Sequence, residues 1–144
     1  MKNFLLFFGL FFFNQVRSQE IAIHISGGSA DATDSLTAVA NDLIGELKKA
    51  GSFEFTINKN ESNRRRNTIS FILRSEADEA AIKYPKALRT YNPEGYYIQS
   101  DAEHIDFVGN TALALQHAIF DYLEQLGYRY FLPGETWQII PSIS

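Results

Sequence analysis

The fold is decided by residues 95–141, which read GYYIQSDAEHIDFVGNTALALQHAIFDYLEQLGYRYFLPGETWQIIP. Two runs rich in β-branched and aromatic residues, 96–100 and 105–108, flank the polar turn 101–104, and this spacing predicts a β-hairpin. From Thr111 onward the apolar residues recur every three or four positions, which predicts an amphipathic helix. The apolar stripe of that helix consists of Ala112, Leu115, Ala118, Ile119, Tyr122, Leu123 and Leu126. Gly127 is expected to end the helix in a left-handed backbone conformation.

The chain before this stretch supplies three more predicted strands. Apolar residues alternate with polar ones, or run continuously, at 20–26, 53–57 and 68–73. The polar run 58–67 is expected to be a hairpin loop between the second and third of these strands.

Two further helices are predicted upstream of residue 95. Residues 35–50 carry a helical apolar stripe that ends at Gly51, and Thr33 or Asp34 is the candidate N-cap. Ser75 is expected to cap a short helix at 76–84. The order of all these elements predicts an α+β two-layer sandwich. In it, both long helices cover one face of a mixed or antiparallel sheet of four to five strands.

Four motifs in the last third resemble a known class of domain. They are Glu94-Gly95-Tyr96-Tyr97-Ile98, the strand from Ile105 to Gly109, Tyr122-Leu123-Glu124-Gln125-Leu126-Gly127, and Arg129-Tyr130-Phe131-Leu132-Pro133-Gly134-Glu135. Together they resemble the small α/β domain that precedes the catalytic barrel in α-glucuronidases, β-N-acetylhexosaminidases and related exported bacterial glycoside hydrolases.

This resemblance implies a non-catalytic N-terminal domain that packs on a (β/α)-barrel and supports it in polysaccharide or glycan degradation. Residues 19–141 would form the accessory domain, and residues 142–144 would begin the linker to the barrel. The family's catalytic carboxylates lie in that barrel, so the resemblance implies no catalytic residue here. The alternative is a free-standing carbohydrate-binding or protein-interaction module, and a third, weaker interpretation is an enzyme complete in these residues.

The first eighteen residues have the pattern of a secretory signal. Lys2 precedes the apolar run 4–13, and Val16-Arg17-Ser18 is typical of a signal peptidase site. We expect cleavage after Ser18 and an exported, periplasmic or extracellular chain that begins at Gln19. A short membrane anchor is the alternative, although ten apolar residues are about half of what a helix needs to cross a bilayer.

Composition excludes several kinds of function. The chain has no cysteine, which removes disulfides, thiolate metal sites and cysteine nucleophiles. Its net charge of −4 disfavours nucleic-acid binding, which needs clustered cations to neutralise phosphates. The basic run 64–66 is interpreted as a solvated loop tip. Gly27-Gly28-Ser29 matches no phosphate-binding loop and is interpreted as a turn between a strand and a helix.

No catalytic, cofactor-binding or metal-binding residue is predicted. His24, His104 and His117 lack the spacing of metal ligands and are expected to be surface or edge histidines. Glycoside hydrolysis needs two carboxylates held about 5–5.5 Å or about 6.5–9.5 Å apart. Five carboxylates gather near the hairpin and on the second long helix, and we interpret them as solvated side chains: Asp101, Glu103, Asp106, Asp121 and Glu124.

Trp137, Ile139 and Ile140 are unusual because they place three large apolar residues in the tail of the domain. They are expected either to fold back as an edge strand or to pack against a neighbouring domain, for which the catalytic barrel is the partner that the resemblance implies. Stacking of the aromatic residue on carbohydrate is the alternative.

Overall fold

The structure is a computed structural model, and it describes residues 19–27, 29–59, 67–74, 92–131 and 138–142. These residues form nine elements, in chain order β1 (Gln19–Ser26), α1 (Ala30–Ala50), β2 (Phe53–Lys59), β3 (Thr68–Leu73), β4 (Tyr96–Ser100), β5 (His104–Gly109), α2 (Ala112–Gln125), β6 (Arg129–Tyr130) and β7 (Gln138–Ile139). The predictions for the signal 1–18, the basic run 64–66, the short helix 76–84 and Trp137 lie outside the described residues.

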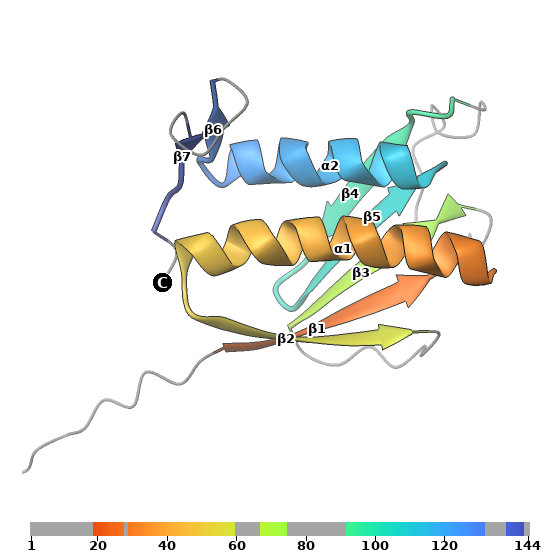
Figure 1. Cartoon of the computed structure of the whole chain (residues 1–144), viewed down its shortest axis with the longest axis horizontal. Helices are drawn as coiled ribbons and strands as arrows, with labels where there is room; N and C mark the ends of the chain where they lie inside the picture. Colours follow the sequence, from red (N-terminus) through yellow and green to blue (C-terminus); the bar gives the residue numbers. More distant parts are fainter. Residues whose placement is uncertain (1–18, 28, 60–66, 75–91, 132–137, 143–144) are drawn as a thin grey trace, which may run out of the picture.

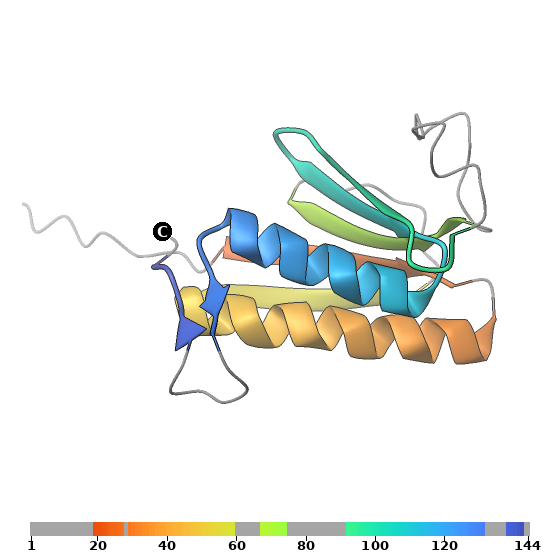
Figure 2. The ribbon, with the colours of Figure 1, turned by 90° about the horizontal axis from the view of Figure 1, so that it is seen from above.

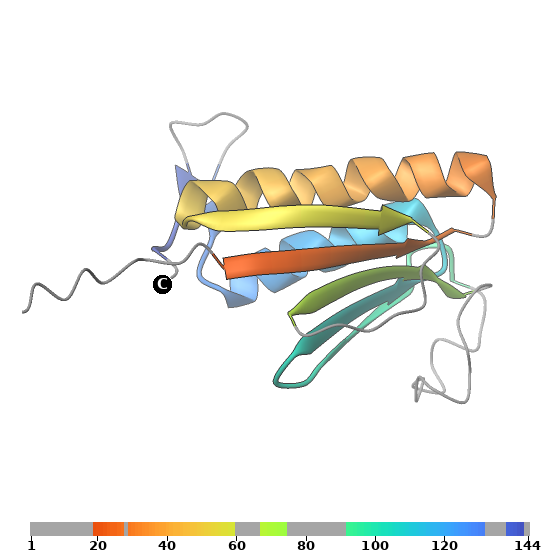
Figure 3. The same cartoon turned by 90° about the horizontal axis from the view of Figure 1, so that it is seen from below.

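Five strands form the main sheet in the order β2-β1-β3-β5-β4. The pairs β2–β1, β1–β3 and β3–β5 are parallel, and β4 completes the sheet antiparallel to β5. Both long helices lie on one face of this sheet (Figures 1 and 2), while neither helix covers the other face (Figure 3). The predicted α+β sandwich, with a mixed sheet and two long helices on one face, is therefore confirmed.

The predicted hairpin between β2 and β3 is wrong. The two strands lie on opposite sides of β1, and both run parallel to it. Residues 58 and 59, which were expected to begin the loop, belong to β2. The alternation of apolar residues determines which face of a strand is buried, but it carries no information about the neighbouring strand or its direction.

Helix α1 begins earlier than predicted, at Ala30 and not at Ser35. Ser29 is its N-cap, and the Ser29 hydroxyl accepts a hydrogen bond from the Ala32 amide at 3.3 Å. The two predicted caps, Thr33 and Asp34, both lie inside the helix, and the Thr33 side chain donates to the Ser29 carbonyl at 2.8 Å. The absence of a side chain at Gly27 lets the end of β1 lie close to the first turn of α1, because a Cβ atom at Gly27 would lie 2.7 Å from the Thr33 amide nitrogen.

Helix α2 follows the predicted stripe closely. The Thr111 hydroxyl caps it by accepting from the Ala114 amide at 3.1 Å. Leu115, Ile119 and Leu123 are fully buried in the core between the helices and the sheet. Residues nearer the open end of the sandwich are only partly buried, namely Tyr122 and Leu126.

Gly127 has a φ of 102°, which confirms the predicted left-handed end of α2. We expect Gly127→Val to lower the free energy of unfolding by at least about 1–2 kcal/mol, because a Cβ clashes with its own backbone at such a φ. A Cβ atom at Gly127 would have the Pro141 Cβ as its nearest neighbour at 3.7 Å, which is an ordinary contact. The loss of stability is therefore expected from the backbone conformation and not from a clash with a neighbouring side chain. Urea unfolding measures the effect.

Gly45→Ala is the control for this prediction. Gly45 lies within α1, is exposed, and has no atom within 4 Å of where its Cβ would be. Alanine there should raise the free energy of unfolding by about 0.5–1 kcal/mol, since glycine weakens a helix interior. A loss of stability in both variants would show that the positive φ is not the cause.

Candidate functional site

The carboxylates considered for catalysis are divided among the β4–β5 turn, β5 and α2. Asp101 and Glu103 are exposed in the β4–β5 turn. Asp106 is buried and alternates with Phe107, so it lies on the sheet face opposite the helices. The Asp121 carboxylate accepts from the Gln125 side chain at 3.4 Å on α2. Within the described ranges, no three His, Cys, Asp or Glu side chains are arranged to hold a metal ion.

His24 corrects a prediction, because it is not a surface or edge histidine. It lies on the interior strand β1 and is only 9% exposed. In register across the neighbouring strands, His24 is beside Ser70, and Ser70 is beside Asp106. A serine–histidine–aspartate relay requires the histidine in the middle, whereas the strand order here places the serine there.

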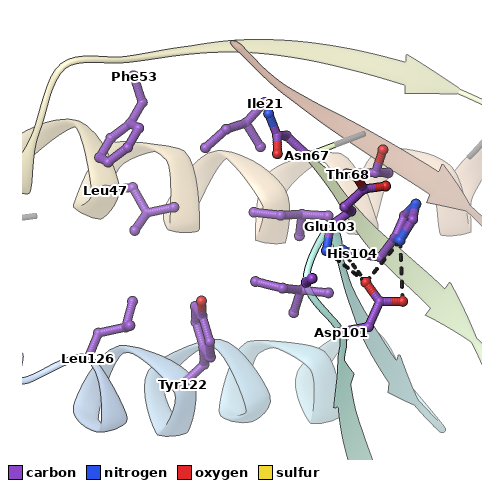
Figure 4. A pocket seen from close by; sticks show the side chains of 13 residues that line it. Ile21, Leu47, Phe53, Asn67, Thr68, Asp101, Glu103, His104, Tyr122 and Leu126 are labelled. Atoms are coloured by element: carbon purple, nitrogen blue, oxygen red, sulfur yellow. Dashed lines mark hydrogen bonds and ion pairs between the residues drawn. The ribbon is translucent and has the colours of Figure 1, made fainter. Parts of the chain in front are cut away.

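An apolar concavity with polar groups at its mouth lies at the end of the sandwich where the parallel strands begin and the helices end. The pocket encloses about 230 Å³. Six of the residues that form its apolar walls come from five different elements: Ile21, Leu47, Phe53, Ile105, Tyr122 and Leu126. Figure 4 shows Leu47 and Phe53 on one side of the space and Tyr122 and Leu126 on the other. The pocket is therefore an open end of the hydrophobic core.

The mouth of the pocket is formed by the β4–β5 turn. The Asp101 Oδ1 atom accepts hydrogen bonds from the Glu103 amide at 2.8 Å and the His104 amide at 2.8 Å, and it lies 3.1 Å from His104 Nδ1. The bond from the Glu103 backbone, followed by that from the His104 side chain, lowers the pKa of Asp101 below 3.8. An exposed carboxylate with a lowered pKa stays ionised and is a poor general acid.

A second surface is the two-stranded sheet of β6 and β7, here called the mini-sheet. Its strands pair Arg129 with Ile139 and Tyr130 with Gln138. The tail therefore folds back as an edge strand, one of the two predicted outcomes. Ile139 and Ile140 nevertheless remain 53% and 37% exposed, and the neighbouring Phe131 is 62% exposed.

Tyrosines anchor the mini-sheet to the helices. Tyr128 is fully buried, and its hydroxyl donates to the Glu46 carbonyl of α1 at 2.9 Å. The Tyr130 ring is stacked near Tyr128, with centroids 6.4 Å apart, and lies edge to face with Phe120 of α2 at 5.7 Å. The apolar residues on the mini-sheet are thus held in place on the body of the domain.

Alkaline pH should destabilise this anchor. Burial, and then the nearby Glu46 carboxylate, raise the pKa values of Tyr128 and Tyr130 above 10.0. Above pH 10.0 the unfolded tyrosines lose protons that the folded chain retains, so the free energy of unfolding should fall as pH rises. Urea unfolding across this range measures the slope. A Tyr130→Phe variant should show a weaker pH dependence, and an unchanged slope would contradict the assignment.

Sequence reasoning missed the pocket and Phe131. The residues around the pocket were placed in the core, which is where their spacing puts them. The pocket residues differ from the rest of the core only in being incompletely buried, and the spacing of apolar residues in the sequence does not predict how completely each is buried. Phe131 falls within the quoted Arg129–Glu135 motif, so its position in the motif was the available signal.

Comparison with known protein families finds no family that matches this chain, and comparison with curated proteins also finds no match. In the part of the chain that the structure describes, neither long helix has the length and apolar character needed to cross a membrane.

Proposed function

We propose that this chain is a non-catalytic accessory domain of an exported glycoside hydrolase of the α-glucuronidase or hexosaminidase type. In this role the domain packs on a catalytic (β/α)-barrel, and its mini-sheet is the docking surface. The observation that carries the proposal is the exposure of Ile139 in the mini-sheet, and of Phe131 and Ile140 directly next to it, on a sheet that is fixed to both helices. Large apolar residues gathered on a rigid surface are typical of a protein interface.

The positions of the motif residues are consistent with this structural role. Gly127 ends α2, and the Arg129 side chain donates to the Glu124 carbonyl at 2.6 Å in the last turn of that helix. The motif residues that the structure describes therefore support the turn that leads into the mini-sheet. The dispersed positions of Asp101, Asp106 and Asp121 further support a domain without its own hydrolytic site.

The activity part of the proposal is tested with aryl-glycosides. The purified chain should give no turnover above buffer. Turnover that is lost on changing Asp121 or Glu124 to alanine would overturn it and favour an enzyme complete in these residues.

The docking part is tested in the secreted protein. The reading frame after the Ser144 codon should continue and encode a barrel, and mass spectrometry of the exported protein should find Gln19 at its N-terminus. Ile139→Asp should then separate the two domains, seen as two thermal transitions and faster proteolysis between them. The matched control is Leu113→Asp, because Leu113 is 52% exposed on α2 and outside the mini-sheet.

A stop codon directly after Ser144 would favour the alternative, a free-standing carbohydrate-binding or protein-interaction module. The same exposed residues would then serve a separate partner. Binding of the purified chain to insoluble polysaccharide, weakened by Phe131→Ala, would identify that partner as a glycan.

A further inference from the structure

The edge strand β2 presents one side of its backbone outward from the main sheet. Among the residues that the structure describes, β2 pairs only with β1, and Figures 1 and 3 show it as the outermost strand. It is the longer of the two edge strands, with seven residues against five in β4. All seven pair with β1 in one regular register, and none is proline. A regular edge of this kind is a template for another strand.

The helix-facing side chains of β2 are incompletely covered. Ile25 on the neighbouring strand β1 is only 1% exposed, whereas Phe55 and Ile57 of β2 are partly buried members of the same core. These two residues therefore leave an apolar strip along the edge of the sheet. A further strand beside β2 would cover this strip, which is favourable because it removes apolar surface from water.

The sequence of β2 is complementary to itself when a second copy runs antiparallel to it. With Thr56, the middle residue, opposite its own copy, all seven residues have a partner, whereas a symmetric register centred one residue away pairs only five. Phe55 is then opposite Ile57, and both this aromatic–β-branched pair and the central threonine pair are of kinds that stabilise a sheet. The remaining pairs place no two charges opposite each other: Glu54 with Asn58, and Phe53 with Lys59.

Helix α1 adds opposite charges along the same edge. The Asp34 carboxylate lies 3.6 Å from the Lys59 ammonium at the end of β2. Leu47 and Phe53 line one pocket, so the last turns of α1 are level with the start of β2. In the antiparallel pairing the end of one β2 meets the start of the other. Asp34 therefore comes level with Lys48 of the second copy, and both side chains are exposed and oppositely charged.

The spacing of the elements permits this contact between helices. Helix α1 contacts both β1 and β2, and neighbouring strands lie about 4.8 Å apart. A second β2 beside the first would therefore place the two α1 helices side by side, with axes about 10–14 Å apart. A helix with its side chains is about 10–12 Å wide, so the side chains of the two helices would meet.

We propose that two copies of this chain associate through β2, antiparallel about a two-fold axis at Thr56. The pairing extends the main sheet across both copies and joins Asp34 of each copy to Lys48 of the other. It uses the same surface on both copies, so it closes at a dimer. Figure 1 shows the mini-sheet at the end of α2, on the far side of α1 from β2, so the dimer leaves the mini-sheet free to dock.

Analytical ultracentrifugation of the purified chain over a concentration series should show a monomer–dimer equilibrium. Thr56→Lys should raise the dissociation constant about three- to tenfold, because it replaces a favourable pair on the axis by two like charges. The fold should tolerate this change, since Thr56 is exposed and its hydroxyl lies 3.5 Å from the Glu20 carboxylate, which would accept the lysine. Ser100→Lys is the matched control, because it adds the same charge at the exposed end of the other edge strand, β4.

Two charge-reversal variants test the contact between the helices. Asp34→Lys and Lys48→Asp should each weaken self-association about two- to thirtyfold, since each replaces two exposed ion pairs by like charges. An equal mixture of the two variants should form a heterodimer again, because every lysine is then opposite an aspartate. A mixture that associates no better than the separate variants would contradict the antiparallel register.

A single cysteine locates the axis. The chain has no cysteine, so Thr56→Cys introduces one thiol in each copy. Residues directly opposite in an antiparallel pair have Cβ atoms about 4.5–5.5 Å apart, close to the separation in a disulfide. Mild oxidation should therefore link the Thr56→Cys chains in pairs. Ser100→Cys, on the edge strand that does not pair, should remain largely unlinked.

Three results would overturn the inference: a chain that stays monomeric up to about 1 mM, a dimer that Thr56→Lys does not weaken, or equal oxidation of the two cysteine variants. The proposed docking function is tested separately, because Ile139→Asp should release the barrel and leave the dimer intact. Loss of the dimer in Ile139→Asp but not in Thr56→Lys would show that the copies meet through the mini-sheet and not through β2.

Discussion

Leu123→Ala is expected to lower the free energy of unfolding by about 2–5 kcal/mol. Leu123 is fully buried on the inner face of α2. Truncation removes its apolar contacts and leaves a cavity that the rigid sheet on one side and α1 on the other are unable to fill. Urea unfolding measures the loss as a lower transition midpoint with an unchanged slope.

Glu124→Ala is the matched control for Leu123→Ala. Glu124 is the next residue on α2 and is exposed, and its backbone carbonyl accepts hydrogen bonds from the Gly127 amide and the Arg129 side chain. The substitution should therefore cost under about 0.5 kcal/mol. Equal losses in the two variants would mean that Glu124 is a buried, partnered carboxylate, and the case for a catalytic site on this domain would reopen.

The sequence predicts the elements whose structure depends on neighbours in the chain. The strand at 68–73 and the strand at 96–100 have the predicted bounds, and α2 begins and ends where its caps indicate. Thr111 and Gly127 carry this information because a cap depends on a few adjacent backbone groups. The face of each strand was also predictable, since side chains alternate.

The pairing of the strands was less predictable than their bounds. The strands β2 and β3 are neighbours in the sequence, yet β1 lies between them in the sheet. The core-facing residues of β2, such as Phe55, would be buried equally well in a hairpin. Parallel pairing is chosen by contacts between residues far apart in the chain, and no local pattern records it. For the same reason His24 was expected to be a surface or edge histidine, although β1 lies between β2 and β3.

The candidate site was predictable only in its parts. Asp101 and His104 were identified in a polar turn, and Leu126 was identified in an apolar stripe. Their meeting at one pocket depends on where the helix ends lie against the β4–β5 turn, which is a property of the packed sandwich. The tail was predicted more fully, because Ile139 and Ile140 stand out as apolar residues beyond the last helix.

Tyr128→Ala is expected to lower the free energy of unfolding by about 3–5 kcal/mol, as removal of a large buried aromatic ring does. Tyr128 is fully buried, and its hydroxyl donates a hydrogen bond to the Glu46 carbonyl at 2.9 Å. Its loss should also release the mini-sheet, because Tyr130 is stacked near the same ring. Urea unfolding gives the energy, and hydrogen exchange of the Arg129 and Ile139 amides reports the release.

Tyr128→Phe separates the ring from the hydroxyl. It keeps the buried ring and removes one hydrogen bond, so it should cost only about 0.5–1.5 kcal/mol and leave exchange at Ile139 nearly unchanged. The contrast matters for function, because a docking surface requires apolar residues held in one position before the partner arrives. If Tyr128→Ala cost no more than Tyr128→Phe and did not speed exchange, the mini-sheet would not depend on this anchor. Its exposed residues would then lose the rigidity on which the docking proposal rests.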